Sequence, residues 1–89
     1  MKVKQGFKLR PLGDEFMLIG ESLEQINFNK MITMNETAAF LWNKVADGID
    51  FEAKTLANFL LEEYEVSEEI ALKDSQTTID SWLQAGIIE

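Results

Sequence analysis

Apolar and polar residues alternate with a period of two in the first third of the chain. In Phe7–Pro11 every second residue is apolar and the residues between are basic, which predicts a short strand whose proline belongs at a sheet edge or a strand end. Glu15–Gly20 is almost continuously apolar, as in a more buried strand. Because Gly13-Asp14 supplies a tight turn between them, the two segments predict a β-hairpin.

A third strand is predicted at about Lys30–Met34, with Phe28 as an inward anchor just before it. Within this strand, Met31 and Thr33 fall on the opposite face from Ile32 and Met34. If those two are buried, Met31 and Thr33 face away from the core and can meet a partner.

The period changes to that of a helix after residue 34. Capping residues and glycines then delimit a first helix between Asn35 and Gly48, a second from a cap at Asp50 to about Glu63, and a third between Ser67 and Gly86. The pattern therefore predicts an α+β fold, with a three-stranded antiparallel sheet followed by three helices.

The third helix has a polar middle. Lys73–Thr78 contains no aliphatic side chain, so we expect that burial contributes little to holding this stretch. Trp42 and Trp82 lie at core spacing on their helices, and we interpret both as packing residues.

A chain of 89 residues predicts a single domain, residues 1–89, with room for one core. No stretch has the apolar length of a membrane span, and the first residues lack the apolar run of a signal peptide. The chain has no cysteine, which fits a reducing compartment. We therefore expect a soluble, cytoplasmic protein without a membrane partner.

The net charge is −8, with lysines and an arginine near the amino terminus and a glutamate cluster in Glu62–Glu69. Since nucleic-acid affinity comes chiefly from neutralising phosphates, this balance disfavours a nucleic-acid partner. The glutamate cluster is typical of a solvated helix end, and it would also suit a basic partner.

Catalytic chemistry has little support in the sequence. Without histidine or cysteine, the usual general base, the common nucleophile pairs and most transition-metal sites are missing. Asp47–Glu52 begins like a calcium loop, but Asn58 stands where an EF-hand requires a bidentate glutamate. We therefore predict no catalytic residue, no metal site and no cofactor.

The block Asn35–Trp42, followed by Asp47-Gly48, resembles the signature of the coenzyme PQQ synthesis protein D family. Weaker similarity extends from Leu9-Arg10-Pro11 to Trp82-Leu83 and the isoleucines after Gly86. The resemblance implies a winged-helix domain of three strands and three helices. It also implies a non-catalytic, chaperone-like role in PQQ biosynthesis or another ribosomal peptide maturation system, in which the leader of a precursor peptide is recognised.

In such recognition elements the leader lies as an added strand beside the third strand, in a cleft whose other wall is the third helix. The resemblance thus implies ten peptide-binding positions: Lys30, Met31, Ile32, Thr33, Met34, Ser75, Gln76, Thr78, Ile79 and Trp82. Family members tend to be apolar along that helix, whereas Ser75 and Thr78 are polar here, which predicts selectivity for more polar leader residues.

The implied partners are a precursor peptide and a separate maturation enzyme, for example a radical SAM enzyme. Two other functions stay open from the sequence. One is a structural or regulatory interaction domain, unrelated to peptide maturation, that uses the cleft or a homodimer surface. The other is a winged-helix DNA binder, for which the fold is the only argument.

Overall fold

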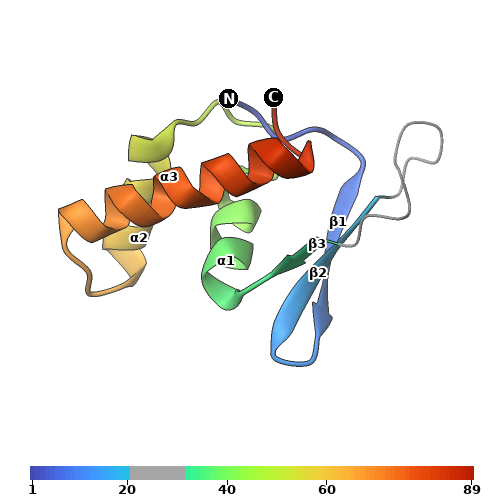
Figure 1. The fold of residues 1–89 in the computed structure, drawn as a ribbon, viewed down its shortest axis with the longest axis horizontal. Coiled ribbons are helices and arrows are strands. Elements are labelled where there is room, and N and C mark those ends of the chain that lie inside the picture. Colours follow the sequence, from blue (N-terminus) through green and yellow to red (C-terminus); the bar gives the residue numbers. More distant parts are fainter. Residues whose placement is uncertain (21–31) are drawn as a thin grey trace.

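The computed structural model describes residues 1–20 and 32–89. Its elements follow the chain in the order β1 (Phe7–Leu12), β2 (Glu15–Gly20), β3 (Ile32–Met34), α1 (Glu36–Val45), α2 (Ala53–Glu63) and α3 (Glu68–Ala85) (Figure 1). The predicted α+β fold, a three-stranded antiparallel sheet followed by three helices, is confirmed, and its arrangement is winged-helix-like.

The sheet has the order β1-β2-β3, so β2 is central. β1 and β2 form the predicted hairpin, in which Leu12 pairs with Glu15 across the Gly13-Asp14 turn. Gly13 has φ +62°, a conformation that favours glycine in tight hairpin turns. Pro11 lies in β1, where an edge strand tolerates its missing N–H, as its position in the sequence predicts.

β3 pairs with β2 through three residues, with Met34 opposite Phe16 and Ile32 opposite Leu18. The described residues confirm the predicted strand Lys30–Met34 over Ile32–Met34. The predicted positions Phe28, Lys30 and Met31 lie outside the described residues.

Side-chain caps start α1 and α3 as predicted. The Asn35 Oδ1 accepts a hydrogen bond from the Ala38 N–H at 2.8 Å, and the Ser67 Oγ accepts one from the Ile70 N–H at 3.2 Å. α3 ends at Gly86, which adopts the left-handed conformation with φ +76°.

The predicted cap of α2 at Asp50 is wrong. The cap is Glu52, which forms a capping box with Thr55, because Phe51 is buried in extended chain before the helix begins. Asp50 instead forms an ion pair of 2.6 Å with the α-amino group of Met1. Its hydrogen bond to this amine and the positive charge of the amine lower the pKa of the Asp50 carboxyl below its usual value.

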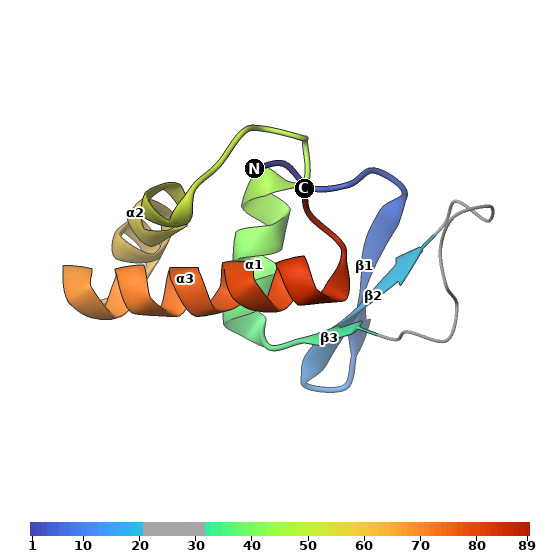
Figure 2. The same ribbon diagram turned by 45° about the horizontal axis from the view of Figure 1, so that its top comes forward.

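The core lies where the three helices and one face of the sheet meet. Trp42 of α1 and Trp82 of α3 pack edge to face with ring centres 5.3 Å apart, and Phe51 contacts Trp82 in the same geometry at 6.2 Å. Leu18 and Met34 add the sheet's buried side chains. The interpretation of both tryptophans as packing residues is therefore confirmed, and their packing fixes α3 across α1 (Figure 2).

The two ends of the chain lie side by side. Lys2 and Glu89 exchange two backbone hydrogen bonds of 2.8 and 2.9 Å, and Val3 pairs with Ile88. This contact anchors Ile87 and Ile88 in the core after α3 ends.

Candidate functional site

One edge of β3 is not paired with another strand among the described residues. Its opposite edge is fully occupied by β2. Along the strand, Met34 is buried, Ile32 is half-buried and Thr33 is exposed, so the alternation that the sequence predicts is present. An unpaired edge presents backbone N–H and C=O groups that another strand can bind.

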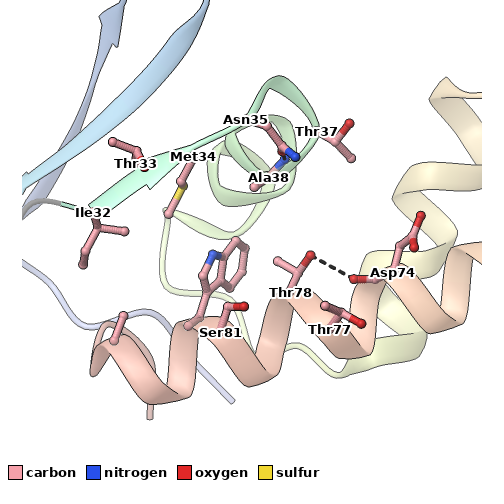
Figure 3. Close-up of a pocket in the computed structure, with 12 residues that line it drawn as sticks. Ile32, Thr33, Met34, Asn35, Thr37, Ala38, Asp74, Thr77, Thr78 and Ser81 are labelled. Carbon is pink, nitrogen blue, oxygen red and sulfur yellow. Dashed lines mark hydrogen bonds between the residues drawn. The ribbon is translucent and has the colours of Figure 1, made fainter.

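A pocket of about 450 Å³ lies between β3, the first turn of α1 and α3 (Figure 3). Twelve residues line it: Ile32, Thr33, Met34, Asn35, Thr37, Ala38, Asp74, Thr77, Thr78, Ser81, Trp82 and Ala85. The volume lies within the range of ligand-binding clefts. Its lining includes three consecutive strand residues and α3 residues from Asp74 to Ala85, which suits an extended chain.

The α3 wall is formed by six residues at helical spacing, Asp74, Thr77, Thr78, Ser81, Trp82 and Ala85. The hydroxyl of Thr77 donates to the Lys73 carbonyl at 3.0 Å, and that of Thr78 donates to the Asp74 carbonyl at 2.9 Å. Since each hydroxyl has a single hydrogen, both oxygens can only accept further hydrogen bonds while these contacts persist.

The start of α1 forms the opposite corner of the pocket. The Asn35 side chain caps α1 and the Asn35 backbone carbonyl accepts from the Ala39 N–H at 2.9 Å, so the chain turns directly from β3 into α1. This turn places Thr37 and Ala38 along the pocket, in line with β3.

Five of the ten positions expected for peptide binding line the pocket: Ile32, Thr33, Met34, Thr78 and Trp82. Lys30 and Met31 lie outside the described residues. The structure thus brings the third strand and part of the third helix together around one cavity.

The other three expected positions, Ser75, Gln76 and Ile79, are not among the lining residues. Ser75 and Ile79 lie on the core face of α3, and both are essentially inaccessible. Gln76 is exposed and donates a hydrogen bond to Asp80 at 3.0 Å. Residues four positions apart point the same way along α3: Ser75 and Ile79 lie toward the core, Gln76 and Asp80 lie toward solvent, and Thr78 and Trp82 line the pocket.

Seven lining residues were not among the expected positions: Asn35, Thr37, Ala38, Asp74, Thr77, Ser81 and Ala85. Helical spacing from Thr78 would have identified Asp74, Ser81 and Ala85, at offsets of minus four, plus three and plus seven. The α1 residues carry no comparable signal, because their place depends on how tightly the chain turns after β3.

The pocket is polar in its middle and carries one charged side chain among its lining residues, Asp74. Across the described part of the chain, no group of three or more acidic residues could hold a metal ion. In that same part, no helix has the length and apolar character needed to span a membrane. The arrangement supplies an open strand edge and a partly polar wall, which together can hold an extended peptide.

Comparison with known proteins adds two solved structures. A complex of TbiB1 with the TbiA(beta) leader peptide matches with a TM-score of 0.74 at 12% identity, covering 100% of this chain and 95% of that chain. A lasso peptide synthetase B1 complexed with the leader peptide matches with a TM-score of 0.70 at 20% identity, covering 97% of this chain and 93% of that chain. At these identities the likeness establishes a common fold.

No curated protein sequence matches this chain significantly. Residues 16–88 match the family described as coenzyme PQQ synthesis protein D (PqqD), a span that includes β2 except its first residue, β3 and all three helices. The match contains every element that forms the pocket. The chain therefore belongs to the coenzyme PQQ synthesis protein D family.

Proposed function

We propose that residues 1–89 form a peptide-binding adaptor that acts in peptide maturation and does no chemistry itself. The leader of a ribosomally made precursor adds as a strand to β3, lies against α3, and is presented to a separate maturation enzyme such as a radical SAM enzyme. The observation that carries this proposal is the edge of β3 that pairs with no strand of the described residues, beside a pocket whose far wall is α3.

The comparisons support this proposal. The chain shares its family with PQQ synthesis protein D, and both solved structures of similar fold contain a leader peptide. Ribosomes release precursor peptides in the cytoplasm, so an adaptor that captures their leaders would act there.

Strand addition also gives a sensible affinity. Each new backbone hydrogen bond contributes about 0.5–1.5 kcal/mol, and an apolar side chain placed beside Ile32 adds to this. Ordering a flexible peptide costs about 2–5 kcal/mol of the gross interaction energy. We therefore expect a micromolar dissociation constant, which lets the peptide pass on to an enzyme.

Charge on α3 argues against the DNA-binding alternative. This helix carries four carboxylates, Glu68, Glu69, Asp74 and Asp80, and a single basic residue, Lys73. A recognition helix needs cations to neutralise phosphates, whereas this helix would repel them.

The test uses a 12-residue peptide selected by the chain from a fully randomised display library. Successive N–H groups of a strand point to opposite sides, so only every second one can bond to β3. Methylating each backbone nitrogen of the peptide in turn should therefore weaken binding at alternate positions, as measured by fluorescence anisotropy. Replacing the same residues by alanine is the matched control, and a loss without period two would contradict strand addition.

A further inference from the structure

The pocket differs in character between its two ends. Figure 3 shows Ile32 at one end and Asp74 at the other, with the threonines of α3 between them. Ala85, on the last turn of α3, also lines the pocket, and Met34 and Trp82 are buried in its floor. A peptide that lies along β3 thus contacts apolar surface at the Ile32 end and a carboxylate at the Asp74 end.

Asp74 has no cationic partner among the described residues. Its side chain is exposed, and the ion pair found in the described part of the chain joins Met1 and Asp50 instead. Its neighbours on the wall, Thr77 and Thr78, have already donated their hydroxyl hydrogens to the helix backbone. This end of the pocket therefore offers acceptors and negative charge, and it suits a donor-rich cation.

The distance between the ends sets a spacing in the bound peptide. Asp74 and Ala85 are eleven residues apart on α3, which corresponds to about 16 Å along the helix axis. A strand advances about 3.3 Å per residue, and residues i, i+2 and i+4 face the same side. Two side chains four positions apart are thus separated by about 13 Å, which lets one reach the apolar end and the other the carboxylate.

We propose that the peptide recognised by this pocket carries an apolar residue for the Ile32 end and, four positions from it, a lysine or arginine that pairs with Asp74. This inference rests on the proposed function, since it names the peptide class that the same pocket selects. The polar wall of α3 then sets selectivity, while the edge of β3 holds the peptide backbone whatever its sequence.

The experiment repeats the randomised 12-residue selection with the unmodified chain, with Asp74→Lys and with Asp80→Lys. The two variants change the net charge equally, but Asp80 is exposed on α3 and does not line the pocket. The control therefore separates a local ion pair from general attraction between basic peptides and an acidic protein. Circular dichroism confirms that each variant keeps its helices.

Peptides selected by the unmodified chain and by Asp80→Lys should share a basic residue four positions from an apolar one. With Asp74→Lys, aspartate or glutamate should replace the basic residue. A peptide from the first selection should bind Asp74→Lys about fivefold more weakly, and its Lys-to-Glu or Arg-to-Glu form should recover on that variant. Identical preferences in all three selections, or an equal change with Asp80→Lys, would overturn the assignment to Asp74.

A Thr33→Pro arm separates this inference from the proposed function. If the selected peptides lose binding to Thr33→Pro but show no basic preference, leader binding stands and the role of Asp74 is refuted. If the peptides bind the folded Thr33→Pro variant with the same affinity as the unmodified chain, strand addition is refuted, and the inference is refuted with it.

Discussion

Ser75 and Thr78 lie three residues apart on α3, and their hydroxyl groups have different environments. Thr78 borders the pocket and donates to the Asp74 carbonyl at 2.9 Å. Ser75 is fully buried, and its Oγ has no hydrogen-bond partner among the described residues. A buried hydroxyl without a partner destabilises the fold, whereas a hydroxyl on the pocket wall contributes to selectivity.

Ser75→Ala should stabilise the protein. Removing the unpartnered hydroxyl relieves a desolvation cost of about 1–3 kcal/mol, part of which is offset because a small cavity remains. We expect the free energy of unfolding to rise by about 1 kcal/mol, measured by urea denaturation. Ser81→Ala controls for helix propensity, because Ser81 is exposed on the same helix. A loss of stability in Ser75→Ala alone would show that this hydroxyl forms a favourable contact.

Asp50 should make stability depend on pH in acid. Because its pKa is lowered in the folded state from the usual 3.8, the folded protein favours the carboxylate, and this contribution is complete above that value. As the pH falls below 3.8, the contribution is lost through the lower folded-state pKa. The effect should be small, since the side chain is exposed.

Thermal unfolding midpoints measured against pH test this account of Asp50. The unmodified chain should be slightly more stable than Asp50→Asn near neutral pH, and the two should converge in acid. Asp47→Asn, an exposed neighbour, is the matched control. A constant difference across the pH range would contradict the role of the ion pair.

At the level of secondary structure elements, the proposed function depends on β3, because its two edges differ in their neighbours. One edge is paired with β2, and the other borders the pocket. Among the described residues of β3 only Thr33 is exposed, so we expect backbone bonding to dominate on this side, with α3 supplying selectivity.

Thr33→Pro should reduce peptide binding far more than Thr33→Ala. Proline lacks the N–H and distorts the edge, whereas alanine keeps the backbone and removes only an exposed side chain. We expect at least a tenfold weaker dissociation constant for proline and less than a threefold change for alanine. Anisotropy titration with a selected peptide measures both, and circular dichroism verifies the fold. Equal losses would indicate recognition through side chains.

The helices and the hairpin were predictable because their signals are local. Asn35, Ser67 and Gly86 each act within one helical turn of themselves, so the sequence alone identifies them. The start of α2 was not predictable, since Asp50 is drawn to the Met1 amine, 49 residues away in the chain. The sequence did not predict that Ser75 lies on the core face of α3, because the apolar stripe of a helix is hard to trace through a run of polar residues.

On the scale of the whole molecule, the core and the pocket share structural parts. Trp82 packs against Trp42 and Phe51 in the core and also lines the pocket. Met34 is likewise buried on the core face of the sheet and also lines the pocket. The packing that holds α3 across α1 therefore also sets the width of the pocket, so the site is largely formed before a peptide arrives.

The central claim is that a peptide binds between β3 and α3. Amide resonances of the isotope-labelled chain, followed by NMR while a selected 12-residue peptide is added, test it most directly. We predict shifts concentrated at Ile32–Met34 and at Asp74–Ala85, with nuclear Overhauser contacts between the peptide backbone and Thr33. Shifts confined to Glu62–Glu69, with β3 unaffected, would contradict the claim and would place the docking surface on the acidic end of α2 and the start of α3.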